Sequence, residues 1–91
     1  MSAAFPWERY DAGWRCRMPG DVTLFASPDR YARGFVPKAA RGSSWRAGAT
    51  IWDAKTSCAS RFGRDTYSEL QPDAASAKKL AEKVYWEASP A

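Results

Sequence analysis

Residues 44–63 read Ser-Trp-Arg-Ala-Gly-Ala-Thr-Ile-Trp-Asp-Ala-Lys-Thr-Ser-Cys-Ala-Ser-Arg-Phe-Gly, and this stretch decides the fold. Its first half alternates between small or apolar residues and mostly polar ones, which is the period-two pattern of a half-buried strand. Residues 53–56 form a short polar break, which predicts a hairpin between 45–52 and 57–62. We therefore expect two adjacent antiparallel strands here.

The hydrophobic pattern also predicts a register for this hairpin, because one face has to be buried. With Trp52 opposite Ser57, Ile51 lies beside Cys58, Ala49 beside Ser60 and Ala47 beside Phe62, so one face is mostly apolar. The other face then carries Arg46, Gly48, Thr50, Trp52, Ser57, Ala59 and Arg61. Two cations and an indole on a solvated sheet face form a candidate binding platform. Alternatively, residues 5–10 cover Trp52 and remove this platform.

A second hairpin precedes the first along the chain. Residues 14–18 and 22–26 both alternate, and Pro-Gly-Asp at 19–21 signals a turn. A three-residue loop pairs Met18 with Val22, Cys16 with Leu24 and Trp14 with Ala26, which gives one apolar face. Arg15 and Arg17 then lie on the other face. We prefer this register over a two-residue turn, which would mix apolar and charged residues on both faces.

The remaining segments complete an α+β domain. Residues 1–12 look irregular and form an N-terminal arm, while 31–36 read as a weaker strand ended by Pro37. A helix begins near Asp73, which caps it, or at Pro72 as its first residue. Its apolar stripe comprises Ala74, Ala77, Leu80, Ala81, Val84 and Ala88, with Lys78, Lys79, Glu82, Lys83 and Glu87 facing away. We predict a single domain over 1–91, with a small antiparallel sheet of four to five strands and one C-terminal helix packed on one face.

Positive charge is concentrated in the centre of the chain. The net charge is +4, yet residues 30–64 hold eight cations against Asp53 alone. The segments before and after are slightly acidic. A basic region with interleaved aromatic residues is typical of proteins that bind a polyanion, most often nucleic acid. The other interpretation is a basic surface with no specific partner.

The sequence offers little that would support catalysis. It contains no histidine and only two cysteines, Cys16 and Cys58, which lie far apart in the chain. No zinc-site spacing, phosphate-binding loop or dinucleotide fingerprint is present. We therefore expect no enzyme activity, no metal and no cofactor. The strand phases place both cysteines on inward faces. We find neither a signal peptide nor a membrane span, which makes a cytoplasmic protein with reduced thiols the expectation.

Part of this chain resembles a known class of DNA-binding modules. Trp45-Arg46-Ala47-Gly48-Ala49-Thr50-Ile51, then Arg61-Phe62-Gly63, then an alanine-rich helix are similar to the ethylene-response-factor class of plants and to phage integrase arm-binding domains. These modules carry a three-stranded sheet with a helix packed on it, and they lay the sheet in the DNA major groove. The resemblance implies DNA contacts from Arg46, Trp52 and Arg61, with Arg33 as a further candidate.

Two hypotheses of function follow. In the first, the chain is a non-enzymatic basic module that contacts nucleic acid through an Arg/Trp sheet face. In the second, it is a phage-encoded inhibitor that binds a protein or nucleoprotein of a host defence complex, in the manner of an anti-CRISPR. Aromatic anchors such as Trp52, Trp86 and Tyr31 would then matter more than the cations. The candidate residues for binding nucleic acid or a protein partner are Arg33, Lys38, Arg41, Arg46, Trp52, Arg61 and Arg64.

Overall fold

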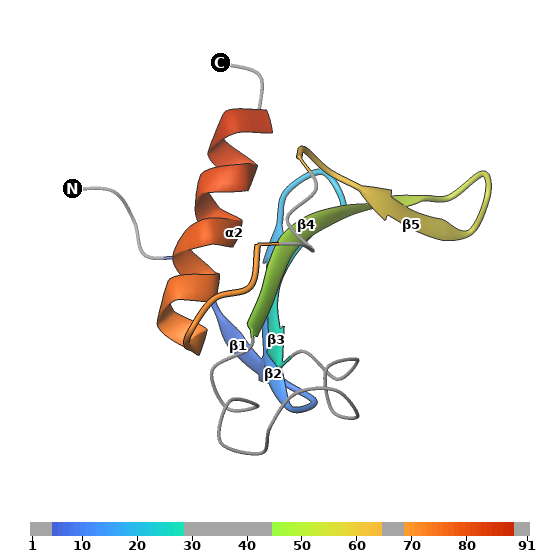
Figure 1. The fold of residues 1–91 in the computed structure, drawn as a ribbon. Coiled ribbons are helices and arrows are strands. Elements are labelled where there is room, and N and C mark those ends of the chain that lie inside the picture. Colours follow the sequence, from blue (N-terminus) through green and yellow to red (C-terminus); the bar gives the residue numbers. More distant parts are fainter. Residues whose placement is uncertain (1–4, 29–44, 65–68, 89–91) are drawn as a thin grey trace.

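A computed structural model describes residues 5–28, 45–64 and 69–88 of the chain. Its elements are β1 (Glu8–Tyr10), β2 (Gly13–Met18), β3 (Val22–Pro28), β4 (Trp45–Asp53), β5 (Cys58–Arg61) and α2 (Ala74–Ala88). The strands form one antiparallel sheet in the order β1-β2-β3-β4-β5, and α2 lies against one face of it (Figure 1). The predicted α+β class, with one antiparallel sheet and one C-terminal helix, is confirmed.

The β2–β3 hairpin has the predicted register. Met18 pairs with Val22, Cys16 with Leu24 and Trp14 with Ala26. The three-residue loop contains two left-handed positions, Gly20 at φ 80° and Asp21 at φ 63°. Glycine adopts this conformation without strain and aspartate tolerates it better than most residues, so the loop sequence suits its backbone.

The predicted register of the β4–β5 hairpin is wrong by two residues. Ile51 pairs with Ser60 and Asp53 with Cys58, because β4 continues through Asp53 and the turn occupies residues 54–57. The turn is closed by Ser57 at φ 52° and by the Lys55 N–H, which donates to Asp53 Oδ1 at 2.9 Å. A shift of two keeps each side chain on its predicted face, so the face assignments of Trp52 and Arg61 stand.

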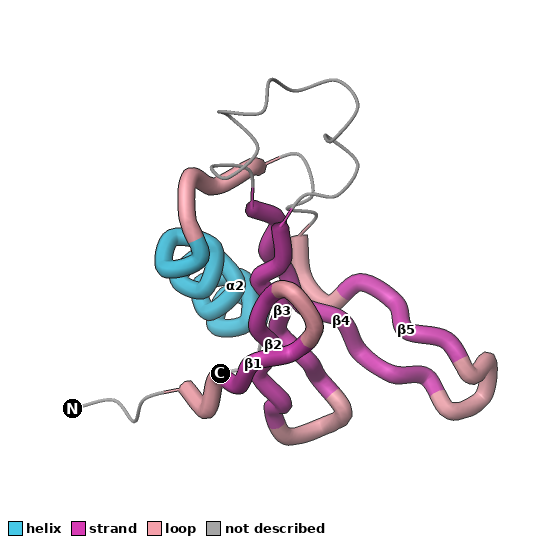
Figure 2. Tube along the Cα trace, turned by 90° about the horizontal axis from the view of Figure 1, so that it is seen from below, coloured by secondary structure: helices cyan, strands magenta, loops and turns pink. Residues whose placement is uncertain are grey.

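The predicted burial of Cys58 is wrong, because this hairpin extends away from α2 and reaches beyond the surface that the helix covers (Figures 1 and 2). All four residues of β5 are exposed, Cys58 included. Cys16 is fully buried, as predicted. Burial together with the nearby carboxylates of Glu82 and Glu8 raises the pKa of its thiol.

A short strand replaces part of the expected irregular arm. Glu8–Tyr10 forms β1 and pairs with β2 through a tight turn in which Asp11 has φ 54°. The three residues of this strand show no alternation of apolar and polar side chains. We therefore attribute the strand to its hydrogen bonds with the edge of β2. Before β1, Phe5 packs edge-on against Tyr85 and Trp86, and the Trp7 indole N–H donates to Glu82 at 2.7 Å. The arm therefore holds α2.

The core lies between α2 and strands β2, β3 and β4. It consists of small and medium residues, namely Cys16, Val22, Leu24, Ala26, Ala47, Ala49, Ala77, Ala81 and Val84. Alanines on both surfaces allow the helix to lie close to the sheet. Asp73 caps α2 as predicted, since its carboxylate accepts the Ser76 N–H at 2.7 Å. This hydrogen bond is the main reason that the pKa of Asp73 is lowered.

Two residues that were predicted to face away from the sheet instead contact β2 and the segment before β1. Lys78 Nζ lies 3.4 Å from the centre of the Trp14 ring, and Glu82 accepts the indole hydrogen bond from Trp7. A cation over an indole face is a favourable contact. The predicted strand at 31–36 lies outside the described residues. Of the helices in the part of the chain that the structure describes, none is long and apolar enough to cross a membrane.

Candidate functional site

The face of the sheet opposite α2 is the candidate site, and we call it the open face. Strand pairing assigns to it the residues that alternate with the core positions: Glu8, Tyr10, Arg15, Arg17, Thr23, Phe25, Arg46, Thr50, Trp52, Ala59 and Arg61. Four of these are arginines and one is a carboxylate. In Figure 2 the helix lies on one side of the strands, and the other side is not covered by it.

Arginines at the β1–β2 end of the open face are paired with a carboxylate. Arg15 Nε lies 2.7 Å from Glu8 Oε1, and Arg17 Nε lies 3.6 Å from the same oxygen. The guanidinium of Arg15 also lies over the Tyr10 ring, 4.2 Å from its centre. Glu8 therefore offsets much of the positive charge of Arg15 and Arg17 at this end of the open face.

Three predicted site residues share the open face on β4 and β5. Arg61 lies one open-face position from Trp52, whereas Arg46 lies six residues, or about 20 Å, from Trp52 along β4. Arg46 and Trp52 lie on β4, Arg61 lies on β5 opposite Thr50, and all three share the open face. Trp52 is 50% exposed, so residues 5–10 do not cover it. Phe5 and Trp7 contact α2 instead, and Glu8–Tyr10 pairs with β2. Arg61 is exposed and Arg46 is half-buried. The open face of this hairpin therefore carries an exposed indole with Arg61 close to it and Arg46 farther along β4.

A shallow pocket adjoins Trp52. It measures about 340 Å³ and is lined by Arg17, Met18, Gly20, Asp21, Val22, Thr23 and Trp52. The backbone N–H of Trp52 donates to the carbonyl of Asp21 at 3.1 Å, which joins the end of β4 to the β2–β3 loop. An indole wall beside an arginine suits a flat ring that carries a negative group.

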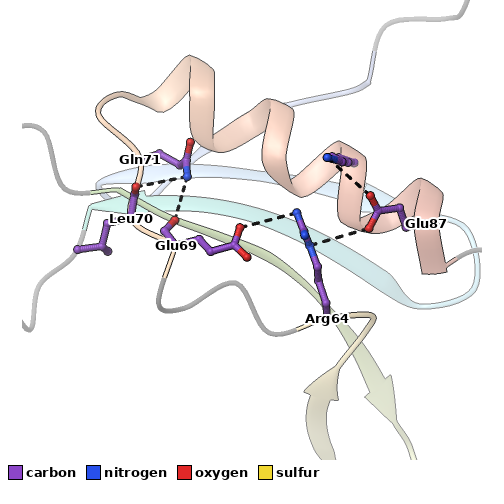
Figure 3. A network of polar contacts seen from close by, with 6 residues as sticks. Arg64, Glu69, Leu70, Gln71 and Glu87 are labelled. Atoms are coloured by element: carbon purple, nitrogen blue, oxygen red, sulfur yellow. Dashed lines mark hydrogen bonds and ion pairs between the residues drawn. The ribbon is translucent and has the colours of Figure 1, made fainter.

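Arg64 lies apart from the open face. Its guanidinium is within 3.7 Å of a Glu69 carboxylate oxygen and within 3.9 Å of a Glu87 oxygen, so it bridges the chain before α2 to the end of the helix (Figure 3). Gln71 orders the same segment, since its side-chain amide donates to the carbonyls of Glu69 and Leu70. These contacts give Arg64 a structural role. Arg33, Lys38 and Arg41 lie outside the described residues.

Four residues of the open face, Tyr10, Arg15, Arg17 and Phe25, were not among those predicted for the site. The signal was present for the two arginines, because alternation in β2 sets them opposite Trp14 and Cys16. What was missing was the strand order, which merges the outer faces of both hairpins into one surface. Among the described residues, no three cysteine or carboxylate side chains gather as metal ligands would.

No protein-family model matches the chain, and neither a curated protein nor a solved structure matches it.

Proposed function

We propose that the chain is a non-enzymatic module that binds nucleic acid through the open face of its sheet. The observation that carries the proposal is that Arg46, Trp52 and Arg61 lie on one face of β4 and β5 that α2 leaves uncovered, with Arg61 next to Trp52 and Arg46 farther along β4. Arginines bind phosphate oxygens through paired N–H donors. An exposed indole adds a stacking surface that accepts any base.

The distribution of charge supports this assignment of roles. Glu8 offsets much of the charge of Arg15 and Arg17, and Arg46 and Arg61 add two further cations on the same face, where they would attract phosphates. The pocket beside Trp52 has room for a nucleobase stacked on the indole, with Thr23 and Asp21 along its rim. In this proposal Arg46 on β4 and Arg61 on β5 bind the nucleic-acid backbone, and Trp52 contacts one base.

Binding of short fluorescent oligonucleotides, single-stranded and duplex, tests this proposal by anisotropy at low salt. The double variant Arg46→Ala/Arg61→Ala should lose about tenfold in affinity for each arginine, the range for a hydrogen bond to a charged group. Lys79→Ala/Lys83→Ala is the matched control, because it removes the same charge from the exposed side of α2. Equal losses in both double variants would show non-specific attraction and contradict the site.

A second candidate function, binding of a protein partner as an inhibitor, is favoured by a different surface. Trp86 on α2 is 61% exposed. Its ring packs edge-on against Phe5, which precedes β1, and against Tyr85 of the same helix. Large aromatic residues of this kind often anchor protein interfaces. Capture of a defined partner that survives high salt and is lost in Trp86→Ser would support this function. Capture that is abolished by moderate salt would count against it.

A further inference from the structure

Among the strands that the structure describes, β5 is the last of the sheet, and no described strand pairs with its outer edge. All four of its residues, Cys58–Arg61, are exposed, and the hairpin that it completes extends away from the helix (Figures 1 and 2). A two-stranded ribbon with little burial is only marginally stable. The opposite edge strand, Glu8–Tyr10, is three residues long and two of them are charged, which discourages pairing. β5 offers Cys, Ala and Ser in succession, with neither proline nor charge before Arg61.

The hydrogen bonds within the hairpin show which groups face this edge. The Phe62 N–H donates to the carbonyl of Ala49 at 2.9 Å, so this is a hydrogen-bonded pair. Such pairs alternate along an antiparallel ladder, which makes Ile51–Ser60 and Asp53–Cys58 the next hydrogen-bonded pairs and leaves Trp52–Ala59, between those two, as a non-hydrogen-bonded pair. The backbone groups of Ala59 are therefore directed away from β4, toward the outer edge.

We propose that β5 pairs with β5 of a second copy of this chain, antiparallel about a two-fold axis at Ala59. Each Ala59 N–H then donates to the Ala59 carbonyl of the other copy, and Cys58 lies opposite the second copy's Ser60. On the open face, this register sets up a row of Trp52, Ala59, the second copy's Ala59 and its Trp52. The alanine methyl groups leave room for the two indoles to cover them, so the half-exposed Trp52 gains burial.

Self-complementarity is the reason for choosing a second copy as the partner. Two-fold pairing places one patch against itself, and here the patch is neutral and small at its centre. Arg61 falls opposite the second copy's Ser57, so no two like charges are directly opposed. A register with Arg61 against Arg61 would be disfavoured for that reason. The contact is small, which is typical of a weak and reversible dimer. This inference does not rest on nucleic-acid binding, because it is tested with protein alone.

Engineered cross-linking tests the register. Cys58 and the second copy's Ser60 would form a non-hydrogen-bonded pair, whose Cβ atoms lie about 4.5–5.5 Å apart and close to the span of a disulfide. Ser60→Cys should therefore form a disulfide-linked dimer with oxidised glutathione as the oxidant, seen on a non-reducing gel. The variant Cys58→Ser/Ser60→Cys keeps the new thiol without its partner and should cross-link far more slowly. Equal rates in the two variants overturn the register.

Sedimentation equilibrium tests the dimer itself. Ala59→Pro removes an N–H that β4 does not use, so the fold should survive while pairing at the edge is blocked. The wild-type mass should rise with concentration and that of Ala59→Pro should not, with circular dichroism confirming the fold. If that variant unfolds, Trp52→Ser leaves the backbone intact and should weaken the dimer severalfold. A wild-type chain that stays monomeric up to about 1 mM, the weak end of specific association, overturns the proposal.

Discussion

Gly63 joins the protruding hairpin to the rest of the fold, and replacing it with alanine should destabilise the protein strongly. Its φ is +85°, and a Cβ placed there would lie 2.9 Å from Val84 Cγ1 and 3.1 Å from the Ala88 Cβ. The left-handed conformation costs a residue with a Cβ about 1–2 kcal/mol. Val84 is fully buried and has little freedom to move aside, so overpacking adds about 1–3 kcal/mol.

The expected loss for Gly63→Ala is therefore about 2–5 kcal/mol in the free energy of unfolding. Urea denaturation followed by tryptophan fluorescence measures it, with the m-value as a check on two-state behaviour. Gly20→Ala is the matched control, since Gly20 also has a positive φ, +80°, but nothing lies within 4 Å of its Cβ position. It should show only the conformational cost. If Gly63→Ala loses no more than Gly20→Ala, the contact with α2 is refuted.

Three further predictions concern the core, the helix cap and the thiols. Leu24→Ala should lower the free energy of unfolding, measured by urea denaturation, by about 2–5 kcal/mol, because Leu24 is fully buried. A loss under about 1 kcal/mol would mean that the surrounding side chains collapse into the space left by Leu24. Asp73→Ala should lower the Tm at neutral pH. The folded-state pKa of Asp73 lies below its ordinary value of 3.8. The difference in Tm between the wild type and the variant should therefore narrow as pH falls through this lowered pKa. A Tm difference that is the same at all pH values would contradict the helix cap. In the native protein, a thiol reagent should label the exposed Cys58 at once and the buried Cys16 only upon unfolding. Fast labelling of both thiols in the native protein would contradict the burial of Cys16 in the core.

Local signals predicted the parts of the fold whose geometry is set nearby in the chain. The register of the β2–β3 hairpin follows from a three-residue loop and from alternation that leaves one apolar face. The helix follows from its stripe and from the Asp73 cap. In these elements the turn, the pattern and the capping residue all indicate the same structure, which is why the sequence was sufficient.

The features that the sequence did not reveal depend on tertiary context. β1 has no alternating pattern and forms because β2 presents an edge. The β4–β5 register depends on Ser57 taking a left-handed conformation that few sequences would signal. The site was only partly predictable for a similar reason. Arg46, Trp52 and Arg61 lie on one hairpin, whereas Arg15 and Arg17 join them only through the strand order.

The central claim is that nucleic acid binds the open face through phosphate contacts from Arg46 and Arg61. The most direct test is a salt titration of binding to duplex DNA, with log affinity plotted against log salt, because the slope is about −0.9 for each phosphate contact. We predict a steep linear slope that becomes shallower by nearly 2 in Arg46→Ala/Arg61→Ala and stays unchanged in Lys79→Ala/Lys83→Ala. An unchanged slope in the arginine variant, or no binding by the wild type at low salt, would contradict the claim.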